Sequence, residues 1–252
     1  MDCFTLIVPF YRNRRMLQEQ ILAWEDYPPQ VSIVLVDDGS PEDASSTVLA
    51  EASPELLPRI DLYRIGVDVP WNRGGARNLG TMQACTDWIV HVDIDHVLPA
   101  AAAARLLEFT PDPGHWYRFR RFRCGRADET RRKDKIADDV EYGEIHPHID
   151  SYLCTTDSYW RAGGYNEDFS GCLGGGSPFL ALMAAENGPA GLLPGDVHLQ
   201  VYTRSAVEDA SDWSLSRDRS EFTRRKARMK KPYRGTNPIR FEWQRQELCT
   251  HG

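Results

Sequence analysis

The sequence predicts an α/β protein built on a mostly parallel sheet flanked by helices. Short β-branched apolar runs alternate with segments of helical spacing, and turn-forming residues separate the two kinds of segment. Strands that alternate with helices pair in parallel, because each helix returns the chain across the sheet. Polar residues follow several of the apolar runs. They are therefore expected at the carboxyl edge of the sheet, where such folds bind their ligands.

The first expected unit is a strand, a helix and a second strand. The strands cover residues 4–8 and 31–36, and the helix covers residues 14–24 with Leu17, Ile21 and Trp24 at helical spacing. Pro41 follows a Gly39-Ser40 turn and suits the first turn of a second helix. The same alternation predicts a strand over 60–65, a helix over 75–85, a strand over 88–92 and a helix over 100–109.

The pattern weakens beyond residue 110. Aromatic residues alternate with arginines over 116–124, which predicts a half-exposed strand. Glycines cluster at 163–164, at 171 and at 174–176, as expected for tight turns or for a loop that approaches a ligand closely. The polar, basic tail from Ser211 is expected to form a docked helix or an arm.

Composition indicates a globular, soluble protein. The chain has 252 residues, of which 41% are hydrophobic, enough to bury a substantial core. It has no apolar run of the roughly 18–20 residues that a membrane span needs, and its first ten residues lack the features of a signal peptide. The six cysteines show no Cys-x-x-Cys spacing, which argues against a zinc cage and predicts reduced thiols. A cytoplasmic location is expected.

The formal net charge of −7 conceals two basic stretches. Residues Arg118 to Lys135 carry a net charge of +6 and residues Arg217 to Arg234 carry +7, so the remainder carries −20. Both stretches also contain aromatic residues, a combination found on nucleic-acid-binding surfaces. A solvated helix face is the ordinary alternative.

An Asp93-Ile94-Asp95 triplet ends the apolar run of residues 88–92 and precedes His96. Two like charges at the end of a buried strand cost free energy, which a divalent cation would offset. Carboxylate oxygens favour Mg²⁺ or Mn²⁺, and such a cation can also neutralise the phosphates of a nucleotide. The alternative is that both aspartates cap a turn.

Five segments, taken in order, resemble the GT-A glycosyltransferases of the family-2 type. They are residues 7–13 (IVPFYRN), 36–40 (VDDGS), 73–80 (RGGARNLG), 93–95 (DID) and 163–167 (GGYNE). The resemblance spans roughly two thirds of the chain. It implies a Rossmann-like GT-A domain over 1–210, with a nucleotide-binding half (1–98) and an acceptor half (99–210), followed by a basic C-terminal extension (211–252).

The resemblance also implies a sugar donor, a metal and site residues. The donor is a nucleotide-diphosphate sugar, with a UDP-sugar expected, and the metal is Mn²⁺ or Mg²⁺. The donor-binding residues are Pro9, Tyr11, Asp37, Asp38, Arg77 and Asp93. Of these, Asp37 and Asp38 are implied at the base, Asp93 at the ribose and Arg77 at the diphosphate. The implied metal ligands are Asp95, with Asp93 beside it, and His198. Arg77 near a helix start also suits an anion on physical grounds, although a surface ion pair is the alternative.

The chain departs from the family pattern where the catalytic base is expected. Family members with an inverting mechanism usually carry an acidic pair after the glycine turn, whereas Gly175 and Gly176 stand there in this sequence. Three interpretations remain: a base from Asp168 or, second, Glu167; a retaining mechanism; or a non-catalytic module that binds nucleotide-sugars. The first is favoured, although a solvated turn explains both acids equally well.

The acceptor is the open part of the prediction. A compact glycosyltransferase with basic arms resembles phage enzymes that glycosylate hydroxymethylated pyrimidines in DNA, which would act in the host cytoplasm. A cell-surface glycan or a lipid-linked acceptor is the alternative, and a nucleotidyltransferase ranks low because the loop of residues 9–13 lacks glycine. Residues 146–150 and 160–165 lie where the family builds its acceptor pocket. Trp71, Trp160 and Tyr165 could stack on a sugar or base, although large aromatic residues are more often part of the core.

Overall fold

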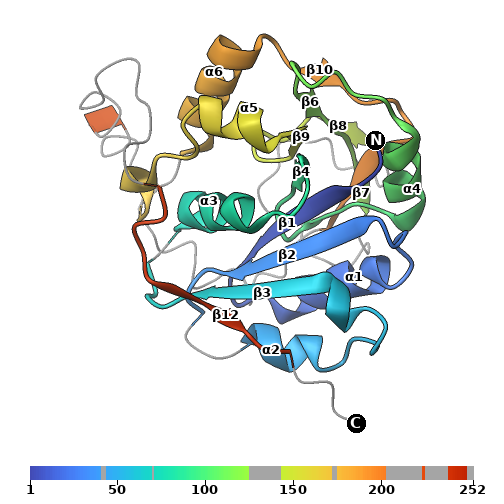
Figure 1. Cartoon of the computed structure of the whole chain (residues 1–252), viewed down its shortest axis with the longest axis vertical. Coiled ribbons are helices and arrows are strands. Elements are labelled where there is room, and N and C mark those ends of the chain that lie inside the picture. Colours follow the sequence, from blue (N-terminus) through green and yellow to red (C-terminus); the bar gives the residue numbers. More distant parts are fainter. Residues whose placement is uncertain are drawn as a thin grey trace.

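The fold is centred on an eight-stranded sheet. The computed structural model describes residues 1–40, 44–69, 71–124, 143–171, 175–202, 223–224 and 238–248. The strand order is β10-β6-β9-β4-β1-β2-β3-β12 (Figure 1). The strands are β1 (Phe4–Phe10), β2 (Val31–Asp37), β3 (Ile60–Ile65), β4 (Trp88–His91), β6 (Tyr117–Arg118), β9 (Tyr152–Thr155), β10 (Gly191–Leu192) and β12 (Trp243–Gln246). Strands β4, β1, β2 and β3 pair in parallel, which confirms the predicted fold class.

A smaller sheet lies beside the carboxyl end of β4. It has the order β5-β11-β7-β8 and consists of β5 (His96–Val97), β11 (His198–Tyr202), β7 (Arg120–Cys124) and β8 (Glu144–Ile145). The strand expected over 116–124 is divided between the two sheets, because β6 pairs with β9 whereas β7 pairs with β11. Phe119, at the junction, is fully buried. The unbroken alternation of the sequence could not reveal this change of partner.

The end of the chain returns to the large sheet. Strand β12 pairs antiparallel with β3, with Trp243 opposite Ile65 and Gln246 opposite Leu62. It covers the edge of the sheet, as Figure 1 shows, and an open edge would otherwise present unpaired backbone groups. The sequence predicts a helix or an arm in this region, and it missed the strand because residues 243–246 lack an apolar alternation.

Helices cover both faces of the large sheet. They are α1 (Arg14–Trp24), α2 (Ala44–Leu49), α3 (Arg73–Gln83), α4 (Ala100–Glu108), α5 (Thr156–Arg161) and α6 (Gly176–Asn187), with 3₁₀ turns η1 (Leu57–Arg59) and η2 (Glu167–Phe169). Leu6 and Val8 pack with α1, whereas Ile7 packs with α3 on the opposite face. Successive residues of β1 face opposite sides of the sheet, and helices cover both sides. This explains why β1 is a nearly continuous apolar run in the sequence. No helix within the described residues has the length and apolar character that a bilayer span requires.

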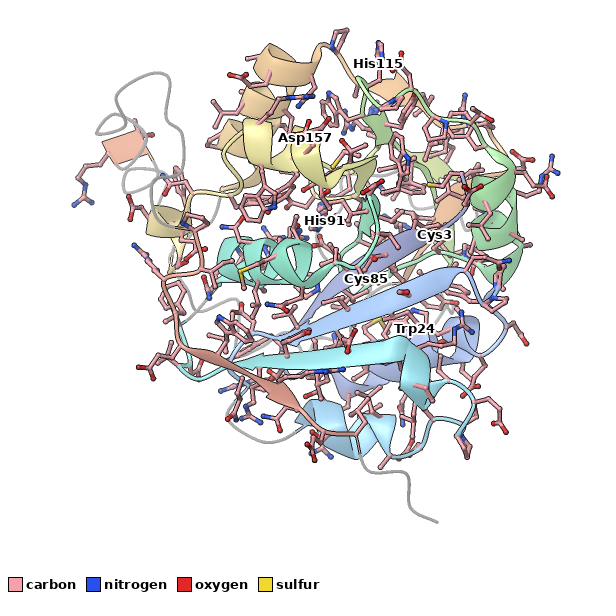
Figure 2. All side chains as sticks on the ribbon, viewed as in Figure 1. Cys3, Trp24, Cys85, His91, His115 and Asp157 are labelled. Atoms are coloured by element: carbon pink, nitrogen blue, oxygen red, sulfur yellow. The ribbon has the colours of Figure 1, made fainter. Side chains whose placement is uncertain are left out.

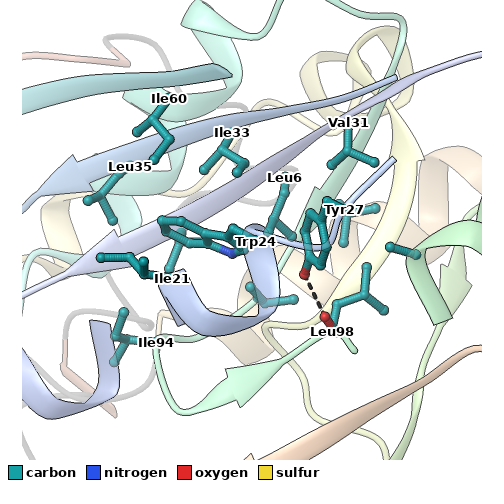
Figure 3. Packing of buried hydrophobic residues seen from close by; sticks show 14 of the residues in the cluster. Leu6, Ile21, Trp24, Tyr27, Val31, Ile33, Leu35, Ile60, Ile94 and Leu98 are labelled. Atoms are coloured by element: carbon teal, nitrogen blue, oxygen red, sulfur yellow. Dashed lines mark hydrogen bonds between the residues drawn. The ribbon is translucent and has the colours of Figure 1, made fainter. Parts of the chain in front are cut away.

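The core on the α1 face is packed around Trp24. This side chain is fully buried among apolar residues of β1 and β2, as Figure 3 shows for Leu6, Ile33 and Leu35. Tyr27 lies beside it and donates a hydrogen bond from its hydroxyl to the backbone oxygen of Leu98, at 2.5 Å. The contact ties the end of α1 to the chain segment that follows β5.

On the opposite face α3 lies close against the sheet. A Cβ atom on Gly80 would overlap Cγ2 of Ile7, so only glycine permits this spacing between α3 and β1. Close packing fixes the start of α3 relative to the carboxyl ends of β1 and β4. The predicted site residues Tyr11 and Asp93 follow those strand ends.

The cysteines whose side chains are described are free thiols. Cys3 and Cys85 are exposed and Cys154 is buried (Figure 2 labels the first two). Burial raises the pKa of the Cys154 thiol above its ordinary range, so it remains protonated. Cys154 therefore acts as a small apolar residue of the core.

Candidate active site

Two adjacent aspartates at the end of β2 have different environments. Asp37 accepts hydrogen bonds from the Ser40 backbone N–H and the Ser45 hydroxyl, both at 2.8 Å. Gly39 has a φ of +73°, and a Cβ there would overlap the Val67 backbone oxygen. Asp37 thus holds the turn. Asp38 is the member of the pair that remains for a ligand.

Asp38 is buried, with 4% of its surface exposed. Its Oδ1 atom accepts no hydrogen bond from any described residue. Burial raises the pKa of this carboxyl group well above its ordinary value, and the neighbouring Asn72 side chain opposes the rise. A buried acceptor without a donor is costly, so Asp38 is suited to accept a hydrogen bond from a ligand.

Asp38→Asn is expected to stabilise the protein at pH 8. Folding raises the pKa of the Asp38 carboxyl group above its value in the unfolded chain, which is near 4. The contribution of Asp38 to the free energy of unfolding is therefore fully present below about pH 4 and is lost as pH rises through the folded pKa. The variant removes that loss, so its free energy of unfolding should exceed that of the wild type by about 1 kcal/mol at pH 8. The difference should vanish near pH 4. Urea unfolding at both pH values measures it, and a less stable variant at pH 8 would contradict it.

Pro9 and Tyr11 lie at the neighbouring end of β1. Pro9 pairs with Val36 in the parallel register of β1 and β2. The Tyr11 hydroxyl donates to Asp68 at 2.9 Å, and the backbone oxygen of Phe10 accepts from the Asp38 N–H at 2.8 Å. Four of the predicted donor-binding residues, Pro9, Tyr11, Asp37 and Asp38, therefore come together at one edge of the sheet.

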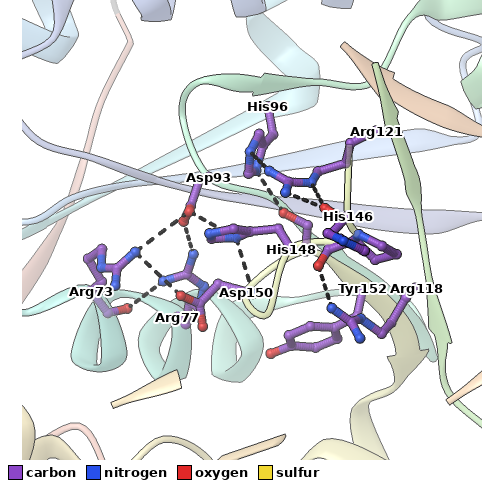
Figure 4. A network of polar contacts seen from close by, with 12 residues as sticks. Arg73, Arg77, Asp93, His96, Arg118, Arg121, His146, His148, Asp150 and Tyr152 are labelled. Atoms are coloured by element: carbon purple, nitrogen blue, oxygen red, sulfur yellow. Dashed lines mark hydrogen bonds and ion pairs between the residues drawn. The ribbon is translucent and has the colours of Figure 1, made fainter. Parts of the chain in front are cut away.

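The start of α3 supplies two arginines to a shared cluster. Arg77 is fully buried and donates from Nη2 to Oδ1 of Asp93, and Arg73, one turn earlier, lies 3.6 Å from Oδ2 of Asp93. Nδ1 of His148 lies 3.3 Å from the same oxygen. Figure 4 shows the three side chains converging on Asp93. Burial alone would raise the pKa of Asp93, but Arg77, His148 and Arg73 hold it well below its ordinary value.

His96 completes a group that could hold a metal ion. Within the described part of the chain, ligand atoms of Asp93, His96 and His148 lie within 4.8 Å of one another. Burial lowers the pKa of His96 to about 4 and also lowers that of His148, so both imidazoles are neutral, the form that binds metals. Nε2 of His96 lies 3.0 Å from Nη1 of Arg121 and accepts from it (Figure 4). A cation bound at Nε2 of His96 would therefore have to displace Arg121.

The other two predicted metal ligands lie outside this group of three. Asp95 is half-buried, and its negative charge acts on both His96 and His148. His198 begins β11, and its ring packs edge-on against Phe122 with ring centres 5.0 Å apart. The sequence could not reveal His148, because it lies more than 50 residues from Asp93 in a segment without a metal-binding pattern.

A cleft opens beside the cluster. It is lined by Trp71, Arg73, Gly74, Arg77, Asp150, Tyr165, Asn166, Phe169, Ser170, Gly175 and Gly176. One wall is the first turns of α3, and the facing wall is the start of α6. The cleft is therefore lined by Arg77, which is predicted to bind the donor diphosphate, and by Gly175 and Gly176, which stand where the acids are expected.

The predicted bases Glu167 and Asp168 do not line this cleft. Glu167 is buried and accepts from the Asn78 amide at 2.8 Å and from the backbone N–H groups of Ile239 and Arg240 at 2.5 and 3.0 Å. The Asp168 side chain is 64% exposed and pairs with Arg240 at 2.7 Å. These contacts attach the segment before β12 to η2.

In the first basic stretch, described arginine side chains contact other residues of this protein. Arg118 donates to the Pro147 backbone oxygen at 2.5 Å, and Arg120 pairs with Glu144 at 2.6 Å. Residues 125–135 lie outside the described residues, as does all of 217–234 except residues 223–224. The predicted nucleic-acid surface therefore stays a prediction.

The fold and site define the class of protein. A parallel sheet with helices on both faces, two acidic sites at the ends of β2 and β4 and a cleft beside them form the GT-A architecture of glycosyltransferases. The family described as Glycosyl transferase family 2 matches residues 5–167, about two thirds of the chain. The chain belongs to this family.

Solved structures show the same fold. The chain is similar to TarS of S. aureus, with 14% identity and a TM-score of 0.60 over 80% of this chain and 37% of that one. A structure of S. aureus TarS residues 1–349 gives 16% identity and a TM-score of 0.58 over 79% of this chain and 60% of that one. This chain thus spans less than two thirds of either. No curated protein matches it.

Proposed function

We propose that this glycosyltransferase moves a sugar from a nucleotide-diphosphate sugar, with a UDP-sugar as donor, to an acceptor hydroxyl, and that a divalent cation assists. The observation that carries the proposal is the placement of Arg73 and Arg77 on the first turns of α3, both facing the cleft. Backbone N–H groups at a helix start and two guanidinium groups together suit the donor diphosphate.

The charge balance of the site supports a metal. Two arginines and two carboxylates, Asp93 and Asp150, cancel one another within the ion-paired cluster. A diphosphate would bring further negative charge into a partly buried space, which is costly without a counter-ion. Asp93, His96 and His148 fit such an ion by donor type and spacing, with Asp95 close by. When bound, the ion supplies charge stabilisation to the departing diphosphate.

The donor base is assigned to the strand ends of β1 and β2. The carboxyl group of Asp38 accepts from a pyrimidine N–H or a ribose hydroxyl, while Asp37 keeps the turn in place. Pro9 and Tyr11, at the neighbouring end of β1, are assigned to the same part of the donor. The imidazole donors of the metal site favour Mn²⁺ over Mg²⁺, since nitrogen ligands suit transition metals.

The test is a donor panel. UDP-glucose, UDP-N-acetylglucosamine and GDP-mannose are incubated with the full chain, and release of the nucleoside diphosphate is measured with Mn²⁺ and with EDTA. Metal-dependent release from a UDP-sugar is the expected result. Tight binding of a UDP-sugar without release would instead support a non-catalytic nucleotide-sugar module, and undiminished release in EDTA would refute the metal.

For the acceptor we propose a hydroxymethylated pyrimidine in DNA, in line with the charges of +6 and +7 on two stretches of the sequence. Binding to a hydroxymethylated duplex should then weaken steeply between 50 and 200 mM salt, on the order of 10³-fold if about six phosphates are contacted. Fluorescence anisotropy measures this dependence. Salt-insensitive transfer to a small neutral glycan would instead identify a sugar acceptor.

A further inference from the structure

The cleft contains one carboxylate among the described residues that line it. Asp150 precedes β9 and is 1% exposed, yet it lies on the cleft wall. Its Oδ1 accepts a hydrogen bond from the Tyr165 hydroxyl at 2.8 Å, and its Oδ2 lies 3.4 Å from Nη1 of Arg73. These two donors fix the orientation of the carboxyl group.

Tyr165 is held in place as a donor. Its ring stacks on Phe179 of α6 with ring centres 4.2 Å apart, and its backbone N–H donates to Asn78 of α3 at 2.8 Å. Burial raises the pKa of the Tyr165 hydroxyl well above its ordinary value, so the hydroxyl keeps its proton. Asp150 therefore receives a hydrogen bond from a rigid neighbour that does not compete with it for protons.

The start of α6 leaves room for the Asp150 carboxyl group. A Cβ atom on Gly176 would overlap Oδ1 of Asp150. A side chain at position 176 and the carboxyl group of Asp150 thus exclude each other. The sequence has no acid at Gly175 or Gly176, and the carboxyl group of Asp150 occupies the space beside Gly176. The carboxylate at this place therefore comes from a part of the chain outside α6.

The other acids near the cleft are committed elsewhere. Asp93 accepts from Arg77, contacts Arg73 and His148, and is not among the residues that line the cleft. Glu167 is bound by Asn78 and by backbone N–H groups of residues 239–240, and Asp168 is bound by Arg240. Of the described residues that line the cleft, Asp150 is the one carboxylate.

We propose that Asp150 is the general base of the transfer reaction, an inference that rests on the proposed function. The acceptor oxygen attacks the anomeric carbon of the donor sugar while its proton passes to a carboxylate oxygen of Asp150. The bond between the anomeric carbon and the diphosphate oxygen breaks, and its electron pair leaves with the nucleoside diphosphate. Asp150 then loses the proton to solvent. A single displacement of this kind inverts the anomeric configuration.

Asp150→Asn tests the role of the charge. The amide keeps the size of the side chain and can still accept from Tyr165, but it cannot take up a proton. We expect kcat for nucleoside-diphosphate release to fall by on the order of 10²–10⁴-fold, with KM for the donor little changed. Asp157→Asn is the matched control, because Asp157 is an exposed acid on α5 that pairs with Arg161 (Figure 2).

A double variant tests the placement. Asp150→Ala removes the carboxyl group, and Gly176→Asp in the same chain returns one to the same space from α6. We expect the double variant to recover at least tenfold of the kcat lost in Asp150→Ala. Gly176→Asp alone should be poorly active, since its side chain meets Asp150. Circular dichroism and thermal unfolding show whether each variant folds.

Failure of this inference is distinguishable from failure of the proposed function. A wild-type chain that releases no nucleoside diphosphate from any donor refutes the proposed function. An active wild type with Asp150→Asn within threefold of its kcat overturns the assignment of Asp150. So does an active enzyme in which Asp168→Asn, rather than Asp150→Asn, abolishes turnover, or a product with retained anomeric configuration.

Discussion

Arg77→Ala is expected to lower the free energy of unfolding by roughly 3 kcal/mol and to abolish binding of the nucleotide-sugar. Breaking a buried ion pair from one side typically costs 3–5 kcal/mol, because the remaining charge stays buried without its partner. Arg77 is fully buried, and its main partner Asp93 is 6% exposed. Arg73 and His148 still contact Asp93 in the variant, which places the cost at the lower end.

Urea unfolding with and without UDP measures both effects. Arg105→Ala is the matched control, because Arg105 also contacts two carboxylates, Glu108 and Asp196, but on an exposed surface. Its removal should leave stability unchanged within error. The double variant Arg77→Ala/Asp93→Asn should recover part of the lost stability, since it removes the stranded charge. Equal losses in the single and double variants would contradict the buried-charge explanation.

His148→Ala is expected to weaken Mn²⁺ binding on the order of 100-fold or more and to abolish metal-dependent release of the nucleoside diphosphate. Loss of a group that merely supports a metal ligand already costs 10–100-fold in affinity, and a ligand should cost at least as much. His148 lies within 4.8 Å of the other two ligand atoms, whereas His198 packs against Phe122.

Electron paramagnetic resonance of free and bound Mn²⁺ measures the affinity independently of activity. The two ligand sets give different outcomes. If Asp93, His96 and His148 hold the ion, His148→Ala loses it and His198→Ala keeps it. If Asp93, Asp95 and His198 hold it, Asp95→Asn and His198→Ala lose it instead. His115→Ala serves as control, because this histidine is exposed and contacts only Asp112 among the described carboxylates (Figure 2).

Local sequence was sufficient for the architecture of the first hundred residues. The strand runs of residues 4–8, 31–36 and 60–65 and the helical spacing of residues 14–24 all correspond to elements of the structure. Each of these predictions rests on a periodicity of a few residues, which is visible in the local sequence and does not depend on distant segments. Strand ends followed by aspartates then indicate a ligand edge, because parallel strands present their carboxyl ends together.

Beyond residue 110 the structure depends on distant partners. The division of residues 116–124 between two sheets follows from pairing with β9 and β11, and β12 follows from pairing with β3. A strand's partner does not appear in its own sequence pattern. Propensity was therefore a poor guide to the acceptor half and to the end of the chain.

The site shows the same distinction. Arg73 could have been found from sequence, since it precedes Arg77 by one helical turn. His148 and Asp150 could be placed near the acceptor region by resemblance, but neither could be joined to Asp93 or to Gly176. Those contacts join residues tens of positions apart in the sequence.

The sequence by itself determined the fold class and the family, and it predicted the edge of the sheet at which the ligands bind. Only the tertiary structure decided which of two adjacent aspartates is free of the turn, which cations neutralise Asp93 and which carboxylate faces the glycines of α6. The physical reason is that backbone periodicity is local, whereas charge compensation and steric exclusion depend on atoms that folding brings together.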